Sequence, residues 1–346
     1  MPLPELSERE RRVLEAVIQS YVETAEPAGS RTLTRRFGLG VSPATIRNTM
    51  SDLEEKGFLF HPHTSAGRIP TDMAYRVYVD SLTRVAPVSS PDHARLSEHL
   101  AAGGSAIEAI LRRAAQSLGI LTQELGVALS PRFEEAVLER LELVRLSSER
   151  ILVVLTLKGG AMRTIFVEVR GEVADRALAE VSSVLNDRLA GLTLREVRLS
   201  LGERLRDASG AAGSAELLNI FVEEGEQLFD LSSAPDEDVV LGQASMLADQ
   251  PEFASGERMR QLIELTETRH HLAELLRRRS LVPGLSITIG NEHGDPRLDQ
   301  FTVVTAAYHA GSVSGVIGVI GPTRMSYDKV ISLVSHTSRL VSELLV

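Results

Sequence analysis

The sequence predicts an α+β protein of more than one domain, with helices in its amino-terminal quarter and two groups of strands beyond them. First, the chain has 346 residues, more than one ordinary hydrophobic core accommodates. Second, residues 1–85 combine helical spacing with capping signals. Third, alternating strand patterns occur in residues 138–170 and 285–320, and residues 172 to about 280 between them have largely helical spacing.

The composition is that of an ordinary globular protein. Hydrophobic residues make up 43% of the chain and charged residues 24%, and there is no cysteine, which excludes disulfides, thiolate nucleophiles and Cys-based zinc sites. The start, MPLPELSERERR, lacks the apolar run of a signal peptide, and apolar stretches such as ILVVLTL are too short to span a bilayer. We therefore expect a cytoplasmic protein without membrane association.

The net charge of −10 is unevenly distributed along the chain. Residues 1–85 contain eleven basic and eleven acidic side chains, so the whole acidic excess lies beyond them. Residues 31–68 contain six basic and three acidic side chains. Because salt screens distant charges within about 8 Å, this local positive surface remains compatible with binding to phosphate.

Two helices are predicted before residue 40. Ser7 followed by Glu10 forms a capping box, and apolar residues then recur at helical spacing up to Val22, so the first helix ends before Glu26-Pro27. Ser30 is the predicted cap of a second helix that runs to Phe37, with Gly38 as its left-handed terminator.

A third helix follows after a short linker, and a hairpin follows the helix. Ser42-Pro43 is a cap with proline at the first helical position, and Gly57 ends the helix. Two short helices joined by a tight glycine-containing turn describe a helix-turn-helix. Phe58–Phe60 is the predicted first strand of the hairpin and Arg68–Pro70 its return strand, which together make a wing.

The polar face of the third helix carries residue types that read DNA bases. Arginine bonds guanine bidentately, asparagine bonds adenine, and small residues contact the thymine methyl group. The predicted base-reading residues, which project away from the apolar stripe, are Ala44, Thr45, Arg47, Asn48 and Ser51. The predicted phosphate-contacting or wing residues are Arg31, Arg35, Arg36, Ser42, His63, Thr64 and Arg68. The alternative is a small helical core with solvated arginines, which agrees less well with the caps and glycines.

The histidines of the predicted hairpin do not indicate a metal site. His61 and His63 are separated by a proline, and no third ligand is visible nearby in the sequence. We expect neither a metal nor a cofactor.

Two long blocks of sequence resemble the HrcA family of bacterial heat-inducible transcription repressors. The blocks are VSPATIRNTMSDLEEKGFLFHPHTSAGRIPTDMAYRVYVD and GVIGPTRMSYDKVI, and the intervening pattern is compatible with the family. The resemblance implies a GAF-like α/β domain interrupted by an inserted, mainly helical dimerising domain. The expected division is a winged helix-turn-helix domain at 1–85, a linker at 86–92, a GAF-like domain with a linker helix at 93–171 plus about 250–346, and the inserted domain at about 172–249.

Several elements are expected between the two blocks and at the carboxyl end. Thr71–Arg84 is a predicted fourth helix. Residues 94–125 are mainly helical with an interruption at 101–105, and periodicity alone leaves open whether they form a dimer seam or a core helix. The strands of residues 138–170 and 285–320 are expected to share one mixed sheet, and a helix is expected over Ser326–Leu345.

Catalytic motifs are incomplete in this chain. The run GVIGVIG matches neither a dinucleotide-binding nor a phosphate-binding loop, so its glycines indicate close backbone packing in a strand. Ser326 and Lys329 satisfy S-x-x-K without its companion motifs. Asn291, Glu292 and His293 lie in a loop between predicted strands, where a turn role is the default and a ligand role the alternative. We therefore expect that the protein is not an enzyme.

The sequence leaves two roles open for two residues near the carboxyl end. Arg324 and Tyr327 follow a predicted strand. They either fix the junction between strand and helix, which we favour, or face an effector pocket or a neighbouring domain.

The resemblance implies a specific function. The expected protein is a homodimeric repressor of chaperonin and chaperone operons that binds double-stranded DNA at an inverted-repeat operator, with the GroEL chaperonin as the partner that maintains its activity. The alternative is a winged-helix repressor controlled by a small-molecule effector in the GAF-like domain.

Overall fold

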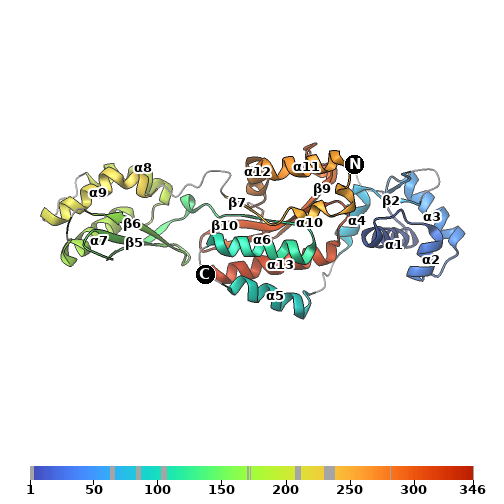
Figure 1. The fold of residues 1–346 in the computed structure, drawn as a ribbon, viewed down its shortest axis with the longest axis horizontal. Helices are drawn as coiled ribbons and strands as arrows, with labels where there is room; N and C mark the ends of the chain where they lie inside the picture. Colours follow the sequence, from blue (N-terminus) through green and yellow to red (C-terminus); the bar gives the residue numbers. More distant parts are fainter. Residues whose placement is uncertain are drawn as a thin grey trace.

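The computed structural model describes residues 4–62, 67–82, 87–102, 107–169, 171, 173–206, 212–229, 238–280 and 282–345. Three parts follow one another along an elongated molecule (Figure 1). Helices with a two-stranded hairpin form one end, a five-stranded sheet with helices forms the middle, and a three-stranded sheet with helices forms the other end. The described residues form helices and several sheets, which confirms the general prediction of an α+β protein.

The amino-terminal part follows its predicted elements closely. Its elements are α1 (Glu8–Thr24), α2 (Ser30–Phe37), α3 (Pro43–Glu55), β1 (Leu59–Phe60), β2 (Ile69–Pro70) and α4 (Asp72–Ser81). The capping box of Ser7 and Glu10 is present, and Gly38 ends α2 in the left-handed conformation with φ +55°. The cap of α2 was predicted one position late, because Gly29 is the N-cap and Ser30 is already helical and buried.

The apolar stripe of α3 packs into the core of this part. Ile46, Met50 and Leu53 are each at most 1% exposed, and α3 contacts both α1 and α2. Strands β1 and β2 pair antiparallel, with Leu59 opposite Pro70. The buried stripe therefore fixes which face of α3 points outward.

The middle part is built on an antiparallel sheet with the strand order β7-β3-β10-β9-β8. Its strands are β3 (Leu125–Leu129), β7 (Val239–Leu241), β8 (Leu285–Ile289), β9 (Phe301–Ala310) and β10 (Val313–Pro322). Gly318 lies so close to β9 that an added Cβ atom would stand 2.0 Å from the carbonyl oxygen of Val304. The interpretation of this glycine as a site of close strand packing is confirmed.

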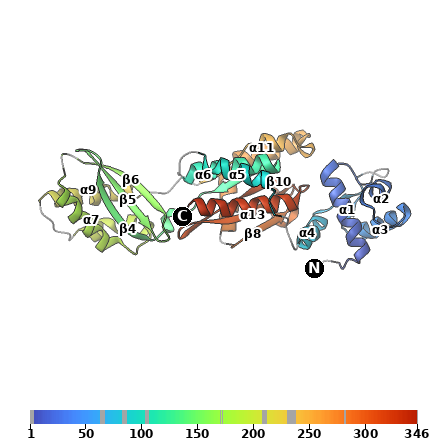
Figure 2. The ribbon, with the colours of Figure 1, turned by 90° about the horizontal axis from the view of Figure 1, so that it is seen from below.

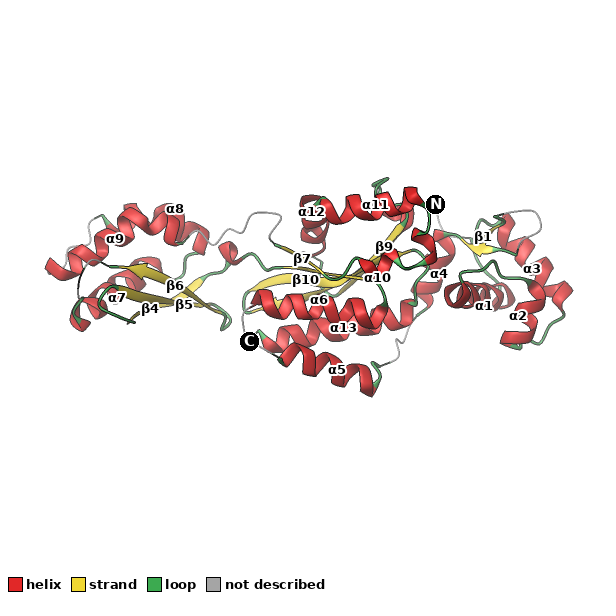
Figure 3. Cartoon of the chain, in the orientation of Figure 1, coloured by secondary structure: helices red, strands yellow, loops and turns green. Residues whose placement is uncertain are grey.

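Helices cover both faces of this sheet (Figure 3). One face is covered by α6 (Ile107–Thr122) and α13 (Tyr327–Leu344), on which α5 (Ser90–Ala101) packs; the other is covered by α12 (Arg269–Ser280), next to α11 (Gly256–Glu267). Neighbouring strand residues such as Val303 and Val304 enter the cores on opposite faces. Helix α6 is therefore a core helix of this part, and α5 begins inside the range predicted as a linker.

Four further helical segments are short. They are η1 (Phe133–Glu135), α10 (Ser245–Ala248), η2 (Pro251–Phe253) and η3 (Gly290–His293). No helix in the described ranges is long and apolar enough to cross a membrane.

In the sequence, the third part is inserted between β3 and β7, which are neighbouring strands of the central sheet. Its elements are β4 (Leu138–Arg145), β5 (Arg150–Leu157), β6 (Met162–Glu168), α7 (Asp175–Leu189), α8 (Leu194–Leu205) and α9 (Ala212–Leu228). The chain leaves the central sheet at Leu129 and returns at Val239, and these two residues are paired in the sheet.

The prediction that the strands of residues 138–170 share one sheet with the carboxyl-terminal strands is wrong. Strands β4, β5 and β6 form a separate sheet. An alternating pattern indicates which face of a strand is buried but does not identify its partner. In the central sheet, β10 pairs instead with β3, which is buried along its whole length. Strand β3 pairs in turn with β7, which has three residues.

Candidate nucleic-acid interface

Helix α3 presents its predicted polar face to solvent. Ala44, Arg47 and Asn48 are exposed, and Thr45 and Ser51 are half-buried. Helices α2 and α3 lie at the end of the molecule farthest from the three-stranded sheet in both views (Figures 1 and 2). Because the exposed residues of this face lie on an outer helix, the face is open to a large partner.

The first turn of α3 is held by its cap. The Ser42 hydroxyl accepts a hydrogen bond of 3.1 Å from the backbone N–H of Thr45 and lies 2.9 Å from the Thr45 hydroxyl. Pro43 occupies the first helical turn, where its missing N–H costs nothing. The cap therefore fixes the start of the helix, which is the portion that reaches deepest into a major groove.

Three arginines of α2 and α3 are free to meet an anion. Arg31, Arg35 and Arg47 are exposed, and within the described ranges none of their side chains forms an ion pair or hydrogen bond. Arg36 differs, because it pairs with Glu23 and its guanidinium lies over the Phe37 ring, 5.7 Å from the centroid. The free arginines make this end of an acidic protein locally positive.

Arg68 lies in a different environment from the one expected for a phosphate contact. Its side chain is only 11% exposed, and its Nε donates a 2.9 Å hydrogen bond to Glu54. Its Nη2 donates to the Ser51 hydroxyl at 3.3 Å. These bonds fasten the return strand of the hairpin to the last turns of α3. His63 and Thr64, also predicted for this surface, lie outside the described residues.

Glu54 is the residue of α3 that joins the helix to the hairpin. His61 Nδ1 lies 2.7 Å from one of its oxygens, and Arg68 holds the other. Burial alone would raise the pKa of the Glu54 carboxyl, but the hydrogen bonds of His61 and Arg68 outweigh burial and lower it. The carboxylate therefore stays charged at neutral pH and joins both strands of the hairpin to α3.

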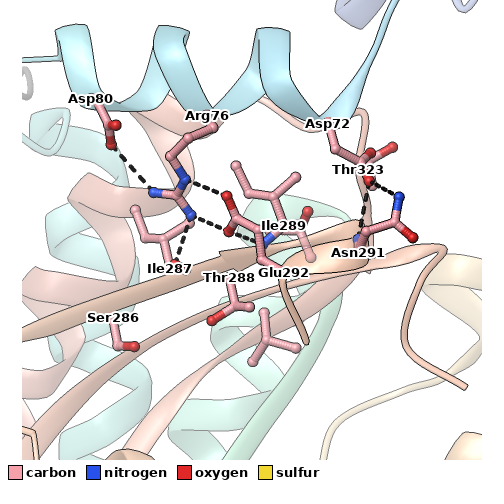
Figure 4. A network of polar contacts seen from close by, with 12 residues as sticks. Asp72, Arg76, Asp80, Ser286, Ile287, Thr288, Ile289, Asn291, Glu292 and Thr323 are labelled. Carbon is pink, nitrogen blue, oxygen red and sulfur yellow. Dashed lines mark hydrogen bonds and ion pairs between the residues drawn. The ribbon is translucent and has the colours of Figure 1, made fainter. Parts of the chain in front are cut away.

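Helix α4 attaches the amino-terminal part to the central sheet (Figure 4). The Arg76 guanidinium donates to Glu292 at 2.6 Å and to the carbonyl oxygen of Ile287 at 2.9 Å. Asp72 accepts two hydrogen bonds of 3.0 Å from Asn291, one from its backbone and one from its side chain. The helix therefore docks on β8 and η3 through charged and amide groups.

Arg324 and Tyr327 lie close to the same junction. Arg324 forms a two-bond ion pair with Glu252 and donates a 2.7 Å hydrogen bond to the carbonyl oxygen of Val22 in α1. The fully buried Tyr327 donates to the carbonyl oxygen of Thr323 at 2.7 Å, and burial raises its pKa. Arg324 thus connects two parts of the molecule, and Tyr327 holds the start of α13.

The sequence did not reveal the docking residues. Asp72 and Arg76 were predicted only as part of a helix, and Asn291 and Glu292 only as turn residues. Arg76 and Glu292 are 216 positions apart, and no spacing rule reports such a contact.

The structure offers little for a metal ion. Within the described ranges no group of three or more histidine, cysteine, aspartate or glutamate residues could hold one. His61 instead bonds Glu54.

Comparisons with known proteins agree on one family. Residues 108–331 match the family model described as HrcA protein C terminal domain. Proteins named heat-inducible transcription repressor HrcA are 41% identical in Chlorobium phaeobacteroides (strain BS1) and 39% identical in Geobacter sulfurreducens, each over 99% of both chains. A crystal structure described as that of a hypothetical protein has a similar fold, with a TM-score of 0.68, 22% identity and 99% of both chains covered.

Proposed function

The chain belongs to the HrcA family of heat-inducible transcription repressors, and we propose that it represses transcription as a homodimer bound to an inverted-repeat operator. Since this family consists of transcription repressors, the prediction that the chain is not an enzyme is confirmed. DNA binding follows from the family. The operator geometry, the dimer and the partner are proposals.

One observation carries the DNA-binding proposal, namely the exposed and unpaired arginines on the outward face of α2 and α3. We assign the amino-terminal part as a winged helix-turn-helix, with α3 as the recognition helix and the β1–β2 hairpin as the wing. Arg47 and Asn48 supply guanine and adenine readout, and Arg31 and Arg35 contact phosphates. Ala44 and Thr45 lie on the turn that enters the groove.

The hydrogen bonds of Arg68 favour a positioning role over a phosphate contact. Arg68 and Ser51 are bonded to each other, and Glu54 neutralises the guanidinium. We infer that they set the angle between wing and recognition helix. A wing held in this way can meet the DNA backbone while α3 lies in the groove.

The dimer is proposed to form through the third part. We assign residues 130–238 as the inserted dimerising domain, because the chain leaves and re-enters the central sheet on the paired strands β3 and β7. The central sheet and its helices then correspond to the GAF-like domain. This division moves the insertion earlier than the predicted 172–249 and places strands β4–β6 inside it.

The uncovered face of the β4–β6 sheet is apolar enough to pair with a second copy. Val144, Leu152 and Phe166 lie side by side across the three strands. Phe166 is 64% exposed and Met162 is 66% exposed. Alternate residues such as Val153 are buried, and α7 packs against β4 with α8 and α9 beside it, so these helices occupy the opposite face. An exposed apolar patch of this kind is typical of an interaction surface.

The regulatory circuit rests on the family resemblance. We propose that the controlled genes are chaperonin and chaperone operons and that GroEL maintains active repressor. Unfolded protein would then occupy the chaperonin at high temperature and release transcription. Operator binding by purified repressor with and without the chaperonin tests this part.

Gel-shift titrations across salt concentrations test the DNA-binding assignments. Arg47→Ala is expected to lower specific affinity by about 1 to 3 kcal/mol and to relax base preference. Arg35→Ala is expected to weaken binding to all sequences and to reduce the salt slope by about 1. Equal losses on operator and random DNA for Arg47→Ala would remove its assignment to base readout.

A further inference from the structure

The third part adjoins one end of the central sheet (Figures 1 and 2), and two tight turns meet there. The turn between β5 and β6 contains Lys158, Gly159 and Gly160, and the turn between β9 and β10 contains Gly311 and Ser312. The Ser312 N–H donates a 3.0 Å hydrogen bond to the carbonyl oxygen of Lys158. The backbones of two segments far apart in the sequence are therefore in direct contact.

This contact leaves no room for a side chain at Gly159. An added Cβ atom would stand 2.7 Å from both the carbonyl carbon and the Cα atom of Gly311, and 2.8 Å from the nitrogen of Ser312. These neighbours are backbone atoms, which cannot turn aside as the end of a flexible side chain can. At Gly311 the overlap is milder, since an added Cβ would stand 3.1 Å from the carbonyl oxygen of Gly159. Glycine at both positions therefore allows the two turns to approach each other.

Gly160 separates this contact from the needs of the turn itself. Its φ of +94° equals that of Gly159, so both positions have a backbone conformation that favours glycine. At Gly160, however, no other part of the described chain lies within 4 Å of an added Cβ. Residues 158–160 are all exposed, so none of them fills a core. Between these two glycines, only Gly159 is packed against the central part.

The contact between the turns restrains a part of the molecule that is otherwise attached by chain connections. The chain enters the third part after Leu129 and returns at Val239. Parts joined in this way move relative to each other unless an interface holds them. Arg163 of β6 also lies 3.4 Å from Glu108 of α6, but these side chains are 29% and 53% exposed. Because exposed ion pairs contribute little, the backbone contact is the stronger of these two restraints.

We propose that the Gly159–Gly311 contact sets the angle between the third part and the central sheet, and that this angle decides which half-site spacing a dimer accepts. The two glycines are then positioning residues that act on operator choice without touching DNA. The angle is a property of the single chain, whereas its effect on the operator rests on the proposed function. In a dimer joined through the third part, rotation at this junction moves the recognition helices at the far ends of both molecules.

Pulsed electron paramagnetic resonance on the full chain without DNA measures the angle. The chain has no cysteine, so Ser183→Cys in α7 and Glu267→Cys in α11, both at exposed positions, carry spin labels specifically. Dilution with unlabelled chain restricts the measured distances to those within one molecule. We expect Gly159→Ala to change the distance distribution, by shifting its mean or broadening it, because the added Cβ separates the turns. Gly160→Ala is the matched control and should leave the distribution unchanged.

Gly311→Ala probes the same contact from the opposite turn. Its overlap is milder, so we expect a smaller change than in Gly159→Ala. This variant decides the matter if the Tm shows that Gly159→Ala does not fold. The proposal is overturned if the folded variants of Gly159 and Gly311 keep the distribution of the parent chain, or if Gly160→Ala changes it equally.

Selection from DNA duplexes with inverted half-sites and spacers of varied length tests the consequence for the operator. We expect Gly159→Ala to prefer a spacing changed by at least about one base pair, which is about 3.4 Å along the duplex, with the half-site sequence unchanged. Gly160→Ala should select the same spacing as the parent. A changed distance distribution with unchanged spacing would overturn the link to operator choice. If the parent selects no inverted repeat, the proposed function is contradicted, and the distance measurement still decides whether the contact sets the angle.

Discussion

Single residues in this protein often serve two elements at once, and Glu10 is an example. Its carboxylate accepts hydrogen bonds from the backbone and side chain of Ser7, which completes the cap of α1. It also accepts a 2.7 Å bond from the Lys56 ammonium at the end of α3. The bonds from Lys56 and then from Ser7 lower the pKa of Glu10 to about 2. The residue therefore couples α1 to α3.

We expect Glu10→Gln to destabilise the fold in a pH-dependent way. The pKa of Glu10 is lower in the folded state than its ordinary value of 4.5, so its contribution is present above about pH 4.5 and is lost as pH falls toward 2. At pH 7 the variant should lose about 1 to 2 kcal/mol of unfolding free energy. Urea unfolding between pH 7 and 3 measures this loss.

Glu8→Gln is the control, because Glu8 lies in the same helical turn but is exposed. Its effect should be smaller and should not follow the same pH course. A Glu10→Gln loss that is equally large at pH 7 and pH 3 would contradict the ion pair.

At the residue scale, the sequence predicts local contacts and misses distant ones. The Ser7–Glu10 cap and the Ser42 cap are visible because capping depends on residues three positions apart. The partner of Arg68 is not visible, since Glu54 is brought to it by the hairpin. A basic residue in a wing is therefore predicted as a phosphate contact, although here it is bonded within the protein.

At the scale of elements, the orientation of α3, the proposed recognition helix, depends on the contacts that hold it. The apolar stripe of α3 is buried in the core, and the hydrogen bonds among Glu54, Arg68 and His61 join the last turns of the helix to the hairpin. These bonds therefore hold the described hairpin strands and α3 together, as the proposed DNA-reading surface requires.

Arg68→Met separates positioning from phosphate binding. We expect the substitution to lower operator affinity while the dependence on salt concentration stays unchanged, because no phosphate contact is removed. A salt slope reduced by about 1 would instead identify Arg68 as a phosphate contact. Arg35→Ala, which is expected to reduce the slope, serves as the comparison in the same gel-shift series.

The elements that the sequence predicts well are the amphipathic ones. Helices α1, α3 and α6 have a clear apolar stripe, and all three stripes are buried. Strand β3 has no polar alternation because both of its faces are covered. The predicted helical range ended at Leu125, its first residue, and no element was predicted for the rest of the strand. Strand pairing is set by long-range packing, which explains why the separate β4–β6 sheet was not foreseen.

At the scale of the whole molecule, the proposed function needs two copies held at a fixed distance. The DNA-reading end and the exposed sheet of the third part lie at opposite ends of the chain (Figure 2). The contacts of Arg76 and Arg324 fix the amino-terminal part on the central sheet. If two copies pair through the third part, the length of both molecules therefore sets the distance between the two proposed recognition helices.

Phe166→Asp tests that dimer. A charge placed in the exposed row of Val144, Leu152 and Phe166 should weaken self-association at least about 30-fold, as measured by sedimentation velocity. Leu199→Asp is the control, because Leu199 is also exposed, at 68%, but lies on α8. A dimer that is unaffected by Phe166→Asp, or equally weakened by both variants, would contradict dimerisation through this sheet.

The most direct test of a two-fold DNA reader is the selection of genomic DNA fragments by the purified full-length protein, followed by sequencing of the bound fragments. We expect enrichment of one inverted repeat, with half-site centres separated by a whole number of helical turns of about 10.5 base pairs. The genes next to these fragments should include chaperonin or chaperone operons. Enrichment of a single half-site or a direct repeat, or no enrichment over random DNA, would contradict the two-fold repressor.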